Sequence, residues 1–227
     1  IFSLKVGRHD SRRLTLSKNL ITNNHEAFIN ISRMLSDSYK AKVSSSQDHG
    51  YENKVIDLRY QYKNKNYQYF VDYYFNDGLT EYDSFGSNLS QTHKDNHFRV
   101  MLVDENDKNE TKFSYIRKGN EINQSADLAT DYTHTKVDSI SIEKSIHNFF
   151  STYSLFGISY SDESMYELSY GTSFKTSNNV REFFFNTYYR YDNNVDFNIG
   201  MRHIHHSVYG DYLTGNINYG RKFNEKS

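Results

Sequence analysis

The sequence predicts an all-β fold of about a dozen antiparallel strands. Apolar and polar residues alternate with period two along successive segments, and no segment has a convincing helical pattern. The composition agrees, because the chain holds 21 Tyr and 16 Phe, which favour strands, and no Pro or Trp. Its length of 227 residues suits one all-β domain.

The clearest element is a hairpin in the first third of the chain. Residues 54–63 ("KVIDLRYQYK") split into an apolar and a polar face, with Asp57 and Arg59 on the polar face. After the short polar turn "NKN", residues 67–76 alternate again, with Asp72 on the polar face. The two segments therefore form adjacent antiparallel strands.

The same split recurs towards the end of the chain. It occurs at residues 166–175 ("YELSYGTSFK"), which we interpret as one ordinary strand. It recurs at residues 182–191, with Arg190 on the polar face, and at residues 195–202, with Arg202 on the polar face. Weaker alternating segments complete the series and lie at residues 2–6, 13–20, 27–34, 97–103, 111–117, 137–143, 152–160 and 212–220.

The connections between these segments differ in length. Those at 64–66 and 107–109 are short, whereas 37–51, 77–95 and 119–132 read as long polar loops. Short turns at one end and long loops at the other are typical of a bacterial outer-membrane barrel. We therefore expect a transmembrane antiparallel up-and-down β-barrel, with a soluble sandwich or soluble barrel as alternatives.

Composition bounds the possible partners. The mean hydropathy of −0.84 argues only against spanning helices, because a barrel strand alternates lipid-facing and lumen-facing residues. The formal net charge of −1 gives no case for nucleic acid or an anionic membrane surface as a partner. Without cysteine, neither a disulfide framework nor a thiolate metal site is possible.

The closing stretch carries the most specific pattern. Residues 197–227 read "FNIGMRHIHHSVYGDYLTGNINYGRKFNEKS": a strand with a Gly-x-Arg centre, a His-Ser-x-x-Gly turn and a strand containing Thr-Gly. The pattern residues are Gly200, Arg202, His206, Ser207, Gly210, Thr214, Gly215, Tyr219, Phe223 and Asn224. This order resembles the barrel segment of TonB-dependent outer-membrane transporters.

The front of the chain supports the same resemblance. Residues 2–20 ("FSLKVGRHDSRRLTLSKNL") are similar to the first barrel strands after the plug domain of that family. Residues 32–64 resemble its next strand, first long loop and returning strand, closest to the vitamin B12 and siderophore branch. The resemblance implies that residues 1–227 are a barrel segment, roughly 12 strands of a barrel of about 22. The plug and the C-terminal half of the barrel are then absent from it.

The resemblance implies a location and a function. We expect the bacterial outer membrane, contact with its lipid, and active transport of cobalamin or a ferric siderophore, coupled to TonB through the absent plug. The polar residues expected to face the lumen are Asp57, Arg59, Asp72, Arg190 and Arg202. A passive porin-like channel of about 12 strands, or a soluble secreted β-domain that binds a ligand, are the alternatives.

The sequence contains two groups of residues that could bind a metal ion. The loops expected at "QDHG" and "NDGLTEYDSFGSN" have the oxygen-rich composition that Ca²⁺ prefers. Vitamin B12 transporters bind calcium through aspartates of the corresponding loops. By resemblance, Asp48, Asp77 and Asp83 are the closest matches here, and Ca²⁺ is the only cofactor expected. The alternative is a pair of solvated loops.

The histidines near the C-terminus form the second candidate. His203 and His205 share a face of a strand whereas His206 points away, and no third ligand lies nearby in the sequence. We interpret them as a polar strand end near the membrane interface. No Gly-x-Ser-x-Gly or His-Glu-x-x-His motif is present, so we do not expect an enzyme.

One observation would exclude the membrane barrel. It requires the apolar side chains to meet lipid, so Tyr60, Tyr69, Phe185 and Phe197 must not be buried together in a dry interior.

Overall fold

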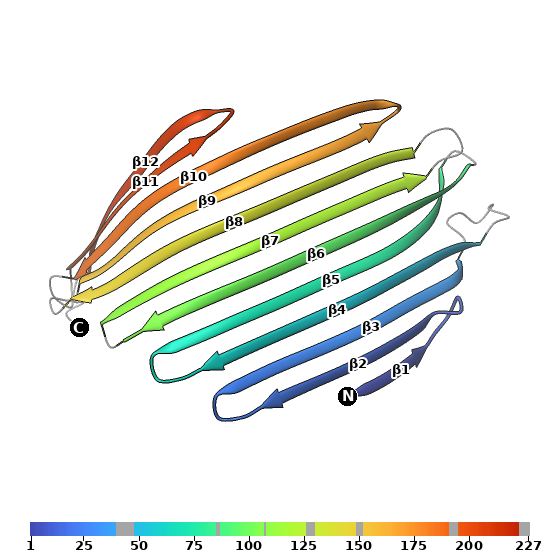
Figure 1. The fold of residues 1–227 in the computed structure, drawn as a ribbon, viewed down its shortest axis with the longest axis horizontal. Coiled ribbons are helices and arrows are strands. Elements are labelled where there is room, and N and C mark those ends of the chain that lie inside the picture. The colour runs from blue at the N-terminus through green and yellow to red at the C-terminus, as the bar shows by residue number, and fades with distance from the viewer. Residues whose placement is uncertain are drawn as a thin grey trace, which may run out of the picture.

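The chain folds into one twelve-stranded antiparallel sheet (Figure 1). The computed structural model describes residues 1–39, 48–84, 87–106, 108–125, 130–148, 152–190 and 195–222. The strands are β1 (Phe2–Val6), β2 (Arg12–Ile21), β3 (His25–Tyr39), β4 (His49–Lys63), β5 (Tyr67–Ser84), β6 (Ser87–Glu105), β7 (Asn109–Ser125), β8 (Thr130–Asn148), β9 (Thr152–Ser169), β10 (Thr172–Arg190), β11 (Val195–His206) and β12 (Gly210–Arg221). Within these residues, no helix is long and apolar enough to span a membrane.

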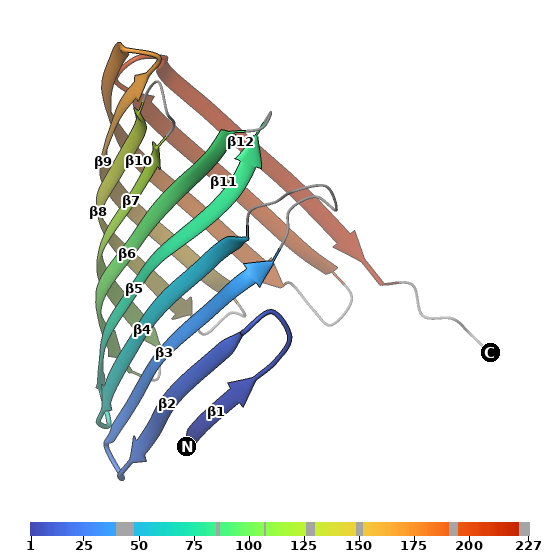
Figure 2. The ribbon, with the colours of Figure 1, turned by 90° about the vertical axis from the view of Figure 1, so that its right-hand side faces the viewer.

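Each strand pairs with its neighbours in sequence, so the order along the sheet is β1 to β12. This confirms the all-β up-and-down fold. Figure 2 shows the sheet bent into a trough, with β1 to β6 in front and β10 to β12 behind. Across the described residues, β1 and β12 do not pair with each other, so the alternative of a barrel closed by these strands alone is not formed.

The hairpin predicted at residues 54–76 is confirmed. In β4 and β5, Tyr60 pairs with Val71 and Tyr62 with Tyr69. The Asn64 side chain fixes the turn, because its Oδ1 accepts hydrogen bonds from the backbone N–H of Asn66 (2.9 Å) and of Tyr67 (2.8 Å). Such an Asx turn stabilises a tight connection without Gly or Pro.

The interpretation of residues 166–175 as one strand is wrong. β9 ends at Ser169 and β10 begins at Thr172, with Tyr170 and Gly171 forming the turn between them. Both turn residues have positive φ, 47° and 77°, as a type I′ hairpin turn requires. The turn also reverses the parity of the alternation, so Phe174, which pairs with Glu167, lies on the polar face.

Tyr170 is an unfavourable residue for this turn. A left-handed backbone conformation suits Asn or Gly. The Tyr170 side chain is 86% exposed, so its packing contributes little stability to offset the unfavourable backbone conformation. We expect Tyr170→Asn to stabilise the protein by about 1 kcal/mol. Urea unfolding in lipid vesicles measures this change, and Gly171→Asn, which loses the glycine of the same turn, provides the opposite-sign control.

The predicted long loops at 77–95 and 119–132 are mostly strand, whereas most of the loop predicted at 37–51 lies outside the described residues. Residues 77–84 continue β5, residues 87–95 begin β6, and residues 119–125 continue β7. Polar composition suggested loops, but the backbone pairs in register throughout, as in Asp77 with Lys94. The strands of these hairpins are 17–19 residues long, whereas about 9–11 residues span a bilayer. They therefore extend well beyond a membrane's apolar core.

Candidate functional site

One face of the sheet is apolar across its whole width. Cross-strand pairing aligns Ile29, Leu58, Tyr73 and Phe98 in one row of this face. Val103, on the opposite face, is the sole buried hydrophobic side chain among the described residues. An apolar face of this extent, left without a dry core within the described residues, is typical of a surface that packs against another apolar phase.

The residues chosen to test the membrane barrel lie on this face, which we call the apolar face. Tyr60, Tyr69 and Phe197 are 40%, 43% and 39% exposed, and Phe185 is half-buried. They are not buried together in a dry interior. Aromatic pairs such as Tyr62 with Tyr69, whose ring centroids are 5.8 Å apart, lie towards the end with the short turns. Amphipathic rings are suited to a membrane interface.

Lys18 interrupts this face on β2. It pairs with Ile29 and lies between Leu16 and Leu20. It is exposed and close to the turn that follows β2, so its long stem can carry the ammonium group to that end of the sheet.

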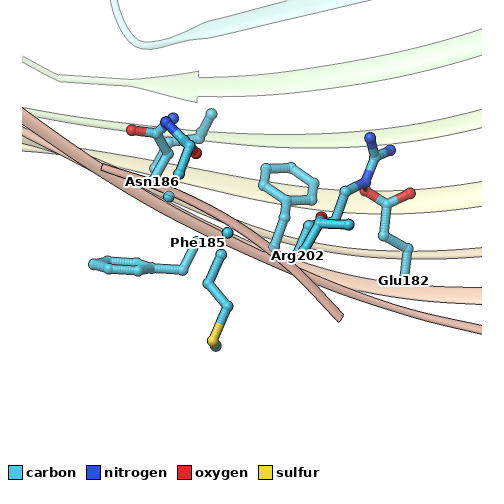
Figure 3. A pocket seen from close by; sticks show the side chains of 11 residues that line it. Glu182, Phe185, Asn186 and Arg202 are labelled. Carbon is cyan, nitrogen blue, oxygen red and sulfur yellow. Dashed lines mark hydrogen bonds and ion pairs between the residues drawn. The ribbon is translucent and has the colours of Figure 1, made fainter. Parts of the chain in front are cut away.

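The opposite face, which we call the polar face, holds all the residues expected in the lumen: Asp57, Arg59, Asp72, Arg190 and Arg202. Figure 3 shows Glu182, Asn186 and Arg202 pointing to the side on which the other strands of the trough lie, whereas Phe185 points away. The polar face is therefore the concave one. That it surrounds an aqueous lumen stays a prediction.

One charged cluster on the polar face lies across β4 to β6. Arg59 binds Asp57 through two hydrogen bonds, from Nε to Oδ1 (3.0 Å) and from Nη2 to Oδ2 (2.8 Å). Arg99 binds Asp72 from Nε to Oδ2 (2.7 Å). The Arg59 guanidinium also lies over the Phe28 ring, 5.5 Å from its centroid. The sequence did not single out Arg99 or Phe28, because the pairing of distant strands brings them here.

The same cluster borders a hollow in the concave face. Arg59 and Asp72 line a cavity of about 370 Å³ together with Glu26, Phe28 and Phe70. Charged and aromatic side chains in such a hollow can contact a polar protein surface or an aromatic, charged ligand.

A second cavity of about 510 Å³ lies between β10, β11 and β12 (Figure 3). Arg202 donates a hydrogen bond from Nε to Glu182 Oε1 (2.7 Å), and the Glu182 side chain is only 15% exposed. Asn186 and Asn216 add amide groups to the lining. This cavity therefore combines a fixed ion pair with neutral hydrogen-bonding groups.

Arg190 is held differently. Its Nη2 donates to the Tyr188 hydroxyl (2.9 Å), and its guanidinium lies 5.6 Å from the centroid of that ring. A third and larger hollow, about 820 Å³, lies at the end with the short turns and is lined by Lys63, Glu105 and His147 among others.

The candidate calcium residues are not placed as expected. Asp77 lies inside strand β5 rather than in a loop, 3.9 Å from Lys54 Nζ. Asp83 also belongs to β5, although its side chain lies outside the described residues, and Asp48 is exposed immediately before β4. A loop location is therefore wrong for Asp77 and Asp83. A calcium role stays a prediction.

The histidine cluster has a carboxylate neighbour that the sequence analysis missed. Asp211 Oδ1 lies 2.9 Å from His205 Nδ1 and 3.3 Å from His203 Nε2. His205 and Asp211 pair directly across β11 and β12, so a hairpin joins residues that seemed unrelated. His206 lies on the other face, where its Nδ1 accepts from the Val208 N–H (3.1 Å). Even so, the described residues contain no group of three potential ligands arranged to hold a metal ion.

Glu52 lies on the same face as the apolar residues of β3 and β4, past the end of their run. Its carboxylate forms ion pairs with Arg33 (2.8 Å) and Lys54 (3.1 Å). The hydrogen bond from Lys54 chiefly lowers the pKa of the Glu52 carboxyl below its ordinary 4.5; burial opposes this effect and Arg33 adds to it. Because the folded pKa is the lower one, the stabilisation is complete above the unfolded pKa and is lost as pH falls through the folded pKa.

We therefore expect Glu52→Gln to reduce the loss of stability between neutral pH and pH values below 4.5. The effect should be well under about 1 kcal/mol, since both cations are largely exposed. Urea midpoints measured across this range test it. An unchanged slope in the variant would contradict the assignment, and Glu26→Gln serves as the exposed control.

Taken together, the antiparallel order, the exposed apolar face and the polar concave face define an up-and-down β-sheet of the kind that makes up part of the barrel in outer-membrane receptors. Solved structures with this fold include the siderophore receptor PirA from Acinetobacter baumannii (TM-score 0.71, 12% identity) and the outer membrane transporter YddB from Escherichia coli (TM-score 0.76, 9% identity). The ferric yersiniabactin uptake receptor FyuA from Yersinia pestis is similar too (TM-score 0.67, 10% identity).

These likenesses cover 99%, 91% and 96% of the chain, respectively. The chain spans 40%, 35% and 42% of the respective neighbours. No protein-family model matches the sequence, and no curated protein is significantly similar to it. At such low identities the likeness establishes the fold, which is the one that the resemblance to TonB-dependent transporters implies.

Proposed function

We propose that this chain is the barrel segment of a TonB-dependent outer-membrane receptor that imports a large, scarce ligand. One observation carries the proposal: a twelve-stranded sheet exposes a continuous apolar face on one side and a charged, hollowed face on the other. A lipid-embedded barrel needs both faces, whereas a soluble sandwich needs a dry core. The fold shared with siderophore receptors adds support.

The ligand class that we propose is a ferric siderophore or a cobalamin, as the resemblance implies. Two structural neighbours are described as siderophore receptors and another as a ferric yersiniabactin uptake receptor, which favours the first of these. In this proposal the polar face, with its Asp57–Arg59 and Glu182–Arg202 pairs, surrounds the plug and the ligand pathway. TonB would act through the plug, and residues of this chain would perform no catalysis.

The absence of cysteine makes a direct test simple. Single cysteines at positions 156, 158, 159, 160 and 161 in β9 would be exposed to a membrane-impermeant maleimide after insertion into lipid vesicles. We expect protection at 156, 158 and 160, on the apolar face, and labelling at 159 and 161 on the polar face. Equal labelling at all these positions would overturn the membrane assignment.

A calcium role for Asp48, Asp77 and Asp83 belongs to the same proposal. Calcium binding would raise the urea midpoint of the protein in proportion to the occupancy of the site. We expect Asp77→Asn together with Asp83→Asn to abolish this increase. If calcium leaves the wild-type midpoint unchanged, the residues have no such role.

A further inference from the structure

The apolar face ends in a belt of charged side chains. On β3 to β12, away from the end with the short turns, the apolar run gives way within two positions of the same face to a charged or histidine residue. The belt comprises Arg33, Glu52, Lys54, Asp77, Lys94, Arg117, Lys136, Asp138, Asp162, Arg181, His203, His205 and Asp211.

The height of the apolar run places this belt relative to a membrane. On β5 the run lasts from Tyr69 to Phe75, and Asp77 follows it on the same face. Strand residues rise by about 3.3 Å each, so the run covers about 20 Å along the strand, and Tyr67 before it on the same face adds about 7 Å. The apolar band of an outer-membrane barrel is about 25 Å tall, so Asp77 lies near its edge. If the apolar face lies in lipid, the belt lies at the level of the lipid headgroups.

The belt repeats one arrangement of charges, in which two basic side chains share a carboxylate. Arg33 and Lys54 share Glu52. Arg117 (3.5 Å) and Lys136 (2.6 Å) share Asp138. Basic groups that share one acid keep N–H donors free for another anion.

A third group has a similar geometry, in which His203 and His205 share Asp211, and these side chains are cations only when protonated. In addition, within the part of the chain that the structure describes, Lys94 and Arg181 have no ion-pair partner and are exposed. The acids Asp77, Glu121 and Asp162 lie between these groups, and Asp77 and Glu121 pair with Lys94 from its two neighbouring strands, so the basic side chains alternate with acids along the belt.

We propose that this belt binds the phosphate groups of anionic lipid headgroups in the leaflet that it faces. The proposal rests on the proposed function, because it requires the apolar face to lie in a bilayer. Arginine and lysine at headgroup level bind phosphate by charge and by hydrogen bonding. The net charge gives no case for an anionic surface as a partner, so the proposal depends on the local arrangement of the charges.

The unpaired cations give the sharpest test. Native mass spectrometry of the protein in mixed micelles would compare retention of phosphatidic acid, which has an exposed phosphate, with that of phosphatidylcholine. We expect preferential retention of phosphatidic acid, and a reduction of this retention by about five-fold for each cation removed, in Lys94→Gln, in Arg181→Gln and in the double variant Lys94→Gln/Arg181→Gln. The double variant Lys63→Gln/Lys118→Gln removes two exposed lysines from the polar face and should retain the lipid.

The outcomes separate this proposal from the proposed function. Equal retention of the two lipids by the wild type, or equal loss in both double variants, would overturn the belt as a headgroup site. Displacement by millimolar inorganic phosphate would also overturn it, because the ion alone would then suffice. The alternating maleimide pattern in β9 is independent of these cations, so it can persist when the belt proposal fails.

Discussion

Ile158→Arg should destabilise the membrane-inserted protein by about 2–4 kcal/mol, the cost of a cation on the lipid face near the bilayer midplane. Ile158 lies midway along the apolar run of β9, between Phe156 and Tyr160, and its side chain is 53% exposed on the apolar face. In lipid this exposure means contact with hydrocarbon, where a guanidinium loses its hydration. Urea titration of the protein in lipid vesicles measures the loss.

The neighbouring residue supplies the control. Ser159 lies on the polar face, directly opposite Glu182, so Ser159→Arg places the same cation near a carboxylate and water. It should cost less than about 1 kcal/mol. The penalty should also fall with distance from the midplane, so Tyr160→Arg should cost less than Ile158→Arg. Equal costs at positions 158 and 159 would be incompatible with a lipid-facing apolar side.

The faces of the strands could be predicted from the sequence because side chains alternate strictly along a strand. That rule placed Asp57 and Arg59 on the face opposite Tyr60, as pairing of β3 to β5 has them. It failed at Phe174. The apolar residues keep their period-two spacing through the turn at Tyr170 and Gly171, so the two strands on either side of the turn looked like one. Tyr170 gave no signal of a turn, since Tyr is rare at positive φ.

Loops and sites were harder to predict for a different reason. Polar residues such as Asp77 suggested a loop, yet a strand that projects beyond the membrane has polar residues on both faces and loses its alternation. The Asp211 contact with His203 and His205, and the Phe28 contact with Arg59, depend on cross-strand register. Register follows from the whole set of pairings rather than from spacing along one segment.

Gly157→Ala should destabilise the protein by about 1–3 kcal/mol, the usual cost of overpacking. Gly157 pairs directly with Phe184 across β9 and β10, and a Cβ at this position would lie 2.1 Å from Cζ of the Phe184 ring. The glycine leaves the space that the tip of the Phe184 ring occupies on the neighbouring strand. Phe184 also lines the cavity next to the Glu182–Arg202 pair, so a displaced ring would change that hollow as well.

A double-mutant cycle tests this contact directly. Phe184→Leu alone should cost stability through lost packing, but in the Gly157→Ala background much of that cost should disappear, because the shorter side chain clears the new methyl group. Ser159→Ala, two residues along on the same face, controls for the change in strand propensity. Strict additivity of Gly157→Ala and Phe184→Leu would mean that the ring does not depend on the glycine. Coupling instead ties the shape of the cavity to a residue that carries no side chain.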